Sequence, residues 1–153
     1  MKRTLLIVLC FTALMPNSWA QKQWVDLSLT SGTLWASEPE IGYYSYEEAK
    51  ITFGVNVPTK WQWKELYESC NVEQDIEHGI TKGTWFRAKN GNSIYIPAQE
   101  IVDVGKKPRV EPFYWTFTTL HSDDIYAFFM NGNTAEFSIM KKHRQLSVIL
   151  VSK

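Results

Sequence analysis

The sequence of 153 residues contains only two cysteines, and the first, Cys10, lies inside a segment with the composition of a secretory leader. The leader is predicted over residues 1–20: two basic residues precede an apolar run of about 11 residues, and small residues precede a cleavage point after Ala20. A membrane-spanning helix needs roughly 20 apolar residues, so this run favours a cleaved signal over an anchor. The mature chain, 21–153, then keeps Cys70 alone, and no internal disulfide can stabilise its fold.

A domain without a cross-link must be stabilised by packing, and the composition is suited to that. Hydrophobic residues make up 44% of the chain and aromatic residues 14%, which supports a single folded domain of about 133 residues. Removing Lys2 and Arg3 with the leader lowers the 16 basic residues to 14, against 16 acidic residues, so bulk charge gives no attraction for nucleic acid. No other segment is long and apolar enough to span a membrane. The sequence predicts a secreted or periplasmic protein.

Two capping boxes predict two short helices. The first box begins at Ser45 and predicts a helix over about residues 46–53, and the second begins at Thr59 and predicts a helix that continues to Cys70. In the second helix the apolar positions are 63, 66, 67 and 70. This spacing places Cys70 on the buried face as a small core residue. A reactive thiol or a disulfide between two chains is the alternative.

Most of the remaining chain is predicted to form antiparallel strands. Segments that alternate apolar and polar residues, or are rich in β-formers, are 24–29, 33–36, 84–89, 93–97, 113–118, 125–130, 134–140 and 146–151. The polar segments 71–83 and 98–112 are predicted as long loops. Two early helices followed by many strands indicate an α+β fold. Five tryptophans in these segments are assigned to the core: Trp24, Trp35, Trp63, Trp85 and Trp115.

Five blocks of the sequence recur in a fixed order in one known family. They are residues 24–36, 57–66 together with Cys70, 90–98, 114–116 and 144–148. In these blocks the chain resembles the Fibrobacter succinogenes major paralogous domain family of exported Bacteroidetes proteins. The resemblance covers nearly all of 21–153 and implies one C-type-lectin-like domain, similar in layout to the formylglycine-generating enzymes. Such a domain has two short helices packed on antiparallel β-sheets with long loops, and the family implies no assigned activity.

The chain departs from the family pattern at four positions. Ser28 and Thr30 stand where the family has Gly and Pro, and Gln145 and Ile149 stand where it has Gly and Arg. Any ion pair or surface contact that the family's arginine makes is therefore absent from this chain.

The sequence carries no recognisable metal site or catalytic motif. One cysteine cannot bind copper as the paired cysteines of formylglycine-generating enzymes do. Glu111-Pro-Phe113 lacks the third oxygen ligand of the calcium-binding lectin motif, and Asp123-Asp124 is not preceded by Trp-Asn. The three histidines, 78, 121 and 143, lack ligand spacing. We expect no cofactor, no metal and no catalytic residue.

Aromatic and basic side chains outside the predicted core are the candidate ligand-binding residues. They are Tyr43, Tyr44, Tyr46, Trp61, Lys106, Lys107 and Arg109. Exposed rings can stack on sugar faces or anchor a protein partner, whereas packing against the edge of the core is the alternative for the four rings. The predicted contact surface comprises the loops 71–83 and 98–124.

The sequence therefore predicts a non-catalytic module that binds a glycan or a cell-surface protein without a metal. An inhibitor or accessory subunit of a surface complex is one alternative. A small extracytoplasmic hydrolase or transferase is another, and its acid and base would come from Asp103, Glu111, His121 and Asp123. The sequence gives no indication of oligomeric state.

Overall fold

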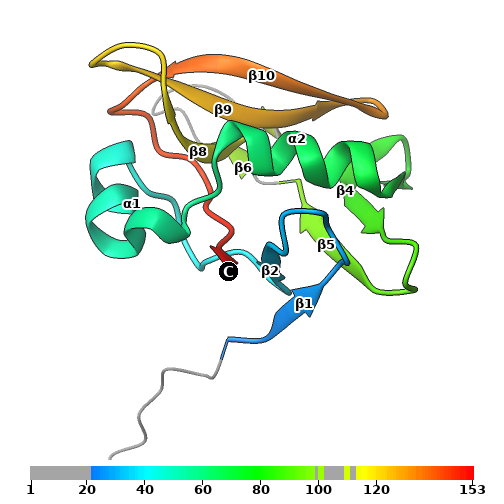
Figure 1. Ribbon diagram of the computed structural model, residues 1–153. Coiled ribbons are helices and arrows are strands. Elements are labelled where there is room, and N and C mark those ends of the chain that lie inside the picture. Colours follow the sequence, from blue (N-terminus) through cyan, green and yellow to red (C-terminus); the bar gives the residue numbers. More distant parts are fainter. Residues whose placement is uncertain (1–21, 99, 102–108, 111–112) are drawn as a thin grey trace, which may run out of the picture.

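The computed structural model describes residues 22–98, 100–101, 109–110 and 113–153 (Figure 1). The predicted leader, Lys106 and Lys107 lie outside these ranges. The described chain is a mixed α+β structure with two short helices and small antiparallel sheets, which confirms the predicted fold class. None of its helices combines the length and the apolar character that crossing a membrane requires.

The elements follow one another in a strand, helix, strand order. The helices are α1 (Tyr46–Phe53), a 3-10 turn (Gly54–Asn56) and α2 (Lys60–Ser69). The strands are β1 (Trp24–Asp26), β2 (Leu34–Ala36), β3 (Asn71–Glu77), β4 (Ile80–Arg87), β5 (Ser93–Pro97), β6 (Glu100–Ile101), β7 (Arg109–Val110), β8 (Tyr114–Thr119), β9 (Asp124–Asn131), β10 (Thr134–Lys141) and β11 (Val151–Ser152).

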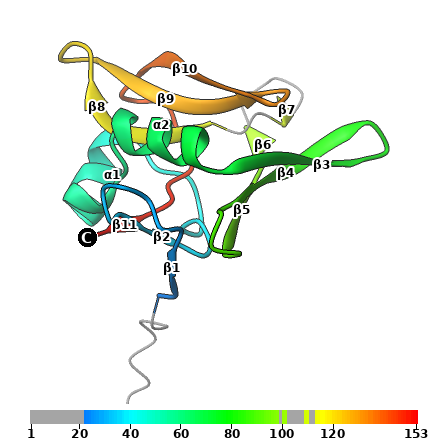
Figure 2. The ribbon, with the colours of Figure 1, turned by 45° about the vertical axis from the view of Figure 1, so that its right-hand side comes forward.

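The strands form three sheets of three strands and one pair, all antiparallel. Their orders are β1-β2-β11, β3-β4-β5, β10-β9-β8 and β6-β7. The first sheet joins the two ends of the described chain, because Val151 of β11 lies opposite Trp35 of β2. The β3–β4 hairpin extends away from the helices, as Figure 2 shows.

Both predicted helices are confirmed together with their capping boxes. The Ser45 hydroxyl accepts a hydrogen bond from the Glu48 amide at 3.3 Å, and the Glu48 carboxylate accepts one from the Ser45 amide at 2.7 Å. The same reciprocal pair joins Thr59 and Gln62 at the start of α2. These local bonds satisfy amides that a helix start leaves without partners. Cys70 caps α2 and is half-buried against the core, as its position on the apolar stripe predicted.

The predicted loop over 71–83 is wrong, because this segment forms β3 and the start of β4. The side chains of Glu73, Asp75 and Glu77 are exposed, whereas those between them face the opposite side of the strand. A strand whose outward residues are Asn71 and three acidic residues looks like a polar loop in the sequence. The hairpin turn at His78 and Gly79, with φ of 52° and 76°, has the left-handed backbone that such turns need.

The predicted strand over 146–151 is also wrong in extent. Only Val151 and Ser152 form a strand, and they pair with β2 instead of continuing the sheet of β8, β9 and β10. The preceding residues 146–149 are buried and make only isolated bridges, from Leu146 to Tyr44 and from Ser147 to Tyr114. Burial on all sides explains why this apolar run resembles a strand in the sequence.

The sheet of β8, β9 and β10 separates two hydrophobic clusters. Alternate residues of β8 and β9 point to opposite faces, so Tyr114 and Phe128 join a cluster with α2, whereas Trp115 and Ala127 join one with α1. Figure 1 shows α2 lying along this sheet. Both faces of this sheet therefore contribute residues to the packed interior.

The tryptophans assigned to the core are only partly found there. Trp35, Trp63 and Trp115 are fully buried, as predicted. Trp24 is 37% exposed on the short strand β1, and Trp85 is half-buried on the side of β4 that faces solvent. Their place in the core was therefore predicted incorrectly, because strand position alone does not tell which face of a sheet is covered.

The turn between β4 and β5 is fastened to the N-terminal strand by side-chain amides. Asn90 Nδ2 donates to the Asp26 carbonyl at 2.9 Å and to Ser28 Oγ at 2.8 Å, and Asn92 Nδ2 donates to the same carbonyl at 2.7 Å. Ser28 itself has a φ of 51°, in the left-handed region. These bonds hold the β3-β4-β5 sheet against the N-terminal segment.

We expect Asn90→Asp to lower the free energy of unfolding by about 2 kcal/mol. The carboxylate cannot donate to the Asp26 carbonyl and would face it with a negative charge. The control is Asn131→Asp at the other Asn-Gly turn, where the amide bonds only the exposed Glu136 carboxylate. That change should cost less than about 1 kcal/mol. Urea unfolding measures both, and equal losses would contradict the role of Asn90.

Candidate functional site

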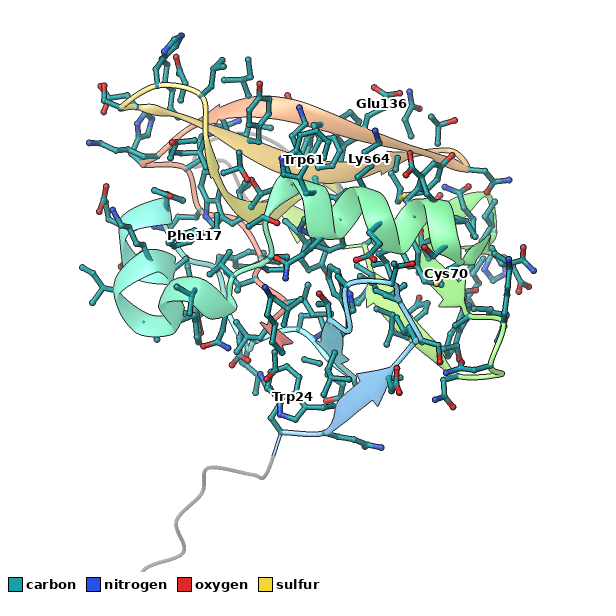
Figure 3. All side chains as sticks on the ribbon, in the orientation of Figure 1. Trp24, Trp61, Lys64, Cys70, Phe117 and Glu136 are labelled. Carbon is teal, nitrogen blue, oxygen red and sulfur yellow. The ribbon has the colours of Figure 1, made fainter. Side chains whose placement is uncertain are left out.

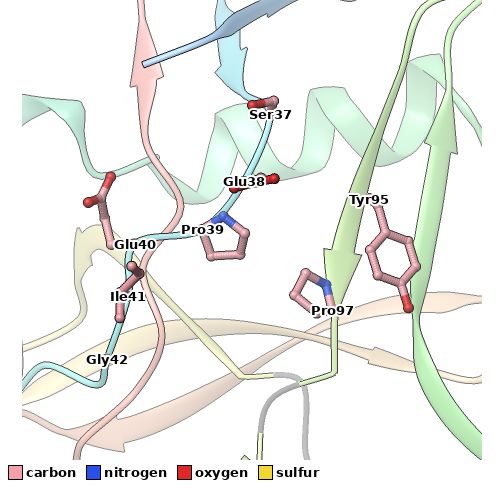
Figure 4. Close-up of a pocket in the computed structure, with 8 residues that line it drawn as sticks. All are labelled: Ser37, Glu38, Pro39, Glu40, Ile41, Gly42, Tyr95 and Pro97. Atoms are coloured by element: carbon pink, nitrogen blue, oxygen red, sulfur yellow. The ribbon is translucent and has the colours of Figure 1, made fainter. Parts of the chain in front are cut away.

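A pocket lies between the loop 37–42 and strand β5 (Figure 4). Its volume is about 470 Å³. It is lined by Ser37, Glu38, Pro39, Glu40, Ile41, Gly42, Tyr95 and Pro97. One wall therefore carries two carboxylates, and the other carries an aromatic ring and a proline ring.

The pocket loop is fixed by backbone hydrogen bonds to segments far away in sequence. The Ser37 amide donates to the Gln23 carbonyl at 2.9 Å, and the Glu40 amide donates to the Val148 carbonyl at 2.8 Å. The Glu40 carboxylate also forms an ion pair with Lys22. Because both ends of the loop are anchored, this wall is formed before any ligand arrives.

Strand β5 continues the pocket wall into the solvent-facing side of the β3-β4-β5 sheet. The strand register places Glu73, Trp85 and Tyr95 in one row across the sheet. A second row contains Asp75, Gly83 and Pro97. The intervening residues Phe86, Ile94 and Ile96 are buried in the core. We call the solvent-facing side of the sheet the outer face, and its residues are Glu73, Asp75, Gly83, Trp85, Arg87, Tyr95 and Pro97, of which Gly83 is buried under the Tyr95 ring.

The two rings of the outer face contact each other. The centroids of the Trp85 and Tyr95 rings are 4.9 Å apart, with the planes inclined at 47°. Arg87 stacks on Trp85, with its Cζ 4.8 Å from the ring, and its Nε donates to Glu73 at 2.9 Å. The contacts run from the pocket through Tyr95 and Trp85 to Arg87, so pocket and outer face form one continuous surface.

Gly83 lets the Tyr95 ring lie flat across the neighbouring strand. A Cβ atom at Gly83 would stand 2.4 Å from Tyr95 Cζ and 2.7 Å from the Ile96 carbonyl oxygen. An aromatic ring that covers a strand glycine is a recognised way to stabilise a sheet. The ring position thus depends on the absence of a side chain at residue 83.

The Tyr95 hydroxyl donates to Asp75 Oδ2 at 3.0 Å. Burial of the phenol and its bond to the Asp75 carboxylate raise the pKa of Tyr95 to about 12. The ring is therefore held at one end by a hydrogen bond and along its face by Gly83, and it stays neutral at physiological pH.

The sequence-predicted binding residues do not gather in one place. Tyr43 is exposed, whereas Tyr44 is half-buried: its hydroxyl donates to the Ile41 carbonyl at 2.8 Å, and its ring meets Phe53 edge-on. Both follow the pocket loop along the chain, but neither lines the pocket. Arg109 lies in β7, and Lys106 and Lys107 lie outside the described residues.

The prediction that Tyr46 is exposed is wrong, because this side chain is 5% exposed. As the first residue of α1 it points inward, where its ring meets Trp115 at a centroid distance of 5.8 Å. Burial raises the pKa of its hydroxyl.

Trp61 has the exposed ring that the sequence predicted, with 69% of its surface accessible. It lies on the same side of α2 as Lys64, whose Nζ is 5.6 Å from the ring centroid (Figure 3). It belongs to a different surface from the pocket, since no lining residue comes from α2.

The candidate catalytic residues show no common site in the described part of the chain. Asp103 and Glu111 lie outside it. His121 and Asp123 are exposed in the turn between β8 and β9, and Asp123 forms a 2.9 Å ion pair with Lys142. Hydrogen bonding to Lys142 and its charge lower the pKa of Asp123. Among the described residues no three His, Cys, Asp or Glu side chains are grouped to hold a metal ion.

The residues of the outer face were missed because Trp85 was assigned to the core and 71–83 to a loop. A usable signal was present. Trp85 and Tyr95 are each five residues from Asn90, so a hairpin whose turn is centred on Asn90 pairs them opposite each other. The Gly83 position and the closing loop 37–42 give no comparable signal.

Comparison of the chain with known protein families, with curated proteins and with solved structures gave no match.

We expect Gly83→Ala to lower the free energy of unfolding by about 1–3 kcal/mol, because the new methyl group overlaps the Tyr95 ring and the Ile96 carbonyl. In a Tyr95→Ala background the steric overlap with the ring is absent, and Gly83→Ala should lower the free energy of unfolding by a smaller amount. Urea unfolding of the four proteins in this cycle measures the coupling. Equal costs in both backgrounds would show that the ring does not require the glycine.

The raised pKa of Tyr95 predicts a loss of stability at alkaline pH. In the unfolded chain this tyrosine ionises near pH 10, whereas in the folded protein it ionises at about 12. Deprotonation between these values favours the unfolded state, so stability present below about pH 10 falls as the pH rises toward 12. Urea unfolding across this interval should show a smaller loss for Tyr95→Phe. Identical pH dependence in both proteins would rule out this contribution.

Proposed function

We propose that this chain is an exported, non-catalytic module that binds a glycan without a metal ion, through the pocket and the outer face. The observation that carries the proposal is the pair Trp85 and Tyr95, held together on a solvent-facing sheet next to a pocket with carboxylates. Aromatic faces suit the apolar C–H faces of pyranose rings, and carboxylates accept hydrogen bonds from sugar hydroxyls.

The rigidity of this surface also supports binding. The pocket loop is anchored at Ser37 and Glu40, and the Tyr95 ring is fixed by Asp75 and Gly83. A preformed surface loses little conformational entropy when a ligand binds, which favours recognition of flexible sugar chains. Part of it comes from 71–83, one of the two segments predicted to form the contact surface.

The arrangement of the elements supports the C-type-lectin-like fold that we propose for this chain. Two helices follow one another early in the chain, β-strands follow them, and β11 returns to pair with β2. Ser28 also has a left-handed φ of 51° at the position where the resembling family has glycine. Membership of that family and export from the cytoplasm are parts of the same proposal.

The test is binding of the purified protein to a panel of soluble polysaccharides, by affinity electrophoresis and calorimetry, with and without a chelator. We expect binding that the chelator does not change. Trp85→Ala should weaken it about tenfold or more, which corresponds to the loss of about 1.4 kcal/mol of stacking. Tyr95→Phe keeps the ring and should weaken it less.

The matched control is Trp61→Ala, which removes an exposed ring of the same type from α2. This variant should bind within about twofold of the wild-type protein, since only a tenfold change corresponds to a stacking contact. Thermal unfolding of each variant shows that the fold is retained. Loss of binding in Trp61→Ala but not in Trp85→Ala would move the site to α2, and absence of binding to every glycan would favour a cell-surface protein as the ligand.

A further inference from the structure

We infer that the glycan bound at this site is uncharged, and that the pocket and outer face exclude polymers bearing carboxylate or sulfate groups. This inference rests on the proposed function and adds the class of ligand. It comes from the balance of charges along the surface that joins the pocket to Trp85.

Four carboxylates lie along this surface, and two of them are neutralised. Glu40 pairs with Lys22, and Glu73 pairs with Arg87 at 2.9 Å. Glu38 and Asp75 form no ion pair with any cation in the described ranges, and Asp75 accepts its hydrogen bond from the neutral Tyr95 hydroxyl. Two negative charges are thus uncompensated, one in the pocket wall and one beside the ring that both parts share.

The cations of this region are already engaged. The Arg87 guanidinium stacks on Trp85 and donates to Glu73. Lys82, in the same strand, pairs with Glu77 at 3.5 Å. An anionic sugar would therefore meet carboxylates without a free cationic partner among the described residues of this surface, and it would lose hydration on binding.

Neutral sugar hydroxyls, in contrast, are favoured by the uncompensated carboxylates. They are neutral donors, and the carboxylates of Glu38 and Asp75 have lone pairs that can accept from them. A hydroxyl-rich ring stacked on the Trp85–Tyr95 pair would have the Asp75 carboxylate, which the Tyr95 hydroxyl contacts, as a neighbouring acceptor. The same two carboxylates that favour a neutral glycan repel an acidic one, so they contribute directly to specificity.

The test compares polymers that share a backbone and differ in charge. The pairs are hydroxyethyl cellulose with carboxymethyl cellulose, curdlan with carboxymethyl curdlan, and dextran with dextran sulfate. At low salt we expect at least one neutral polymer to bind, with its charged derivative at least tenfold weaker. Raising the salt concentration should bring the affinities of the neutral and charged polymers closer together. Screening weakens charge repulsion, whereas a steric effect of the substituent does not depend on salt.

The double variant Glu38→Gln and Asp75→Asn should move the affinity ratio of charged to neutral polymer toward one. Its control, Glu47→Gln with Glu68→Gln on the two helices, changes the net charge equally and should leave the ratio as in the wild-type protein. Equal or tighter binding of the charged derivatives by the wild-type protein would overturn the inference while the proposed function stands. Binding to no polymer at all would overturn both.

Discussion

The Trp63 side chain is the contact on which the arrangement of the elements depends. Its ring stacks on Phe128 of β9 at a centroid distance of 4.0 Å and meets Trp35 of β2 edge-on at 4.8 Å. All three rings are buried. One side chain of α2 thereby joins the sheet of β8, β9 and β10 to the sheet that contains β2 and β11 through buried ring contacts.

The candidate site lies on elements that pack against this core, but its own side chains are outside it. The inner side of the β3-β4-β5 sheet contributes Phe86 and Ile94 to the cluster around Trp63, and the other side carries Trp85 and Tyr95 toward solvent. The opposite wall, the loop 37–42, continues from β2 and is anchored near the C-terminal segment. Both walls are therefore attached to the same packed interior, and their spacing is set by it.

Local signals made part of this structure predictable. The capping boxes at Ser45 and Thr59 identified both helices, because each depends on residues three positions apart. Strand β3 was missed because its acidic face hides the alternation, and the partner of β11 was missed because it lies more than a hundred residues away in a chain of 153. The burial of Tyr46 and the position of the loop 37–42 opposite β5 depend on tertiary packing. A local sequence pattern does not report such packing.

The pairing of β11 with β2 has a consequence for synthesis. Buried residues from 146 to 151 complete both hydrophobic clusters, so the tryptophans of the first half of the described chain cannot be fully buried before these residues have been synthesised. Contacts so distant in sequence also form slowly, because a large loop must close first. The nascent polypeptide should consequently remain unfolded until residues 146–151 have left the ribosome.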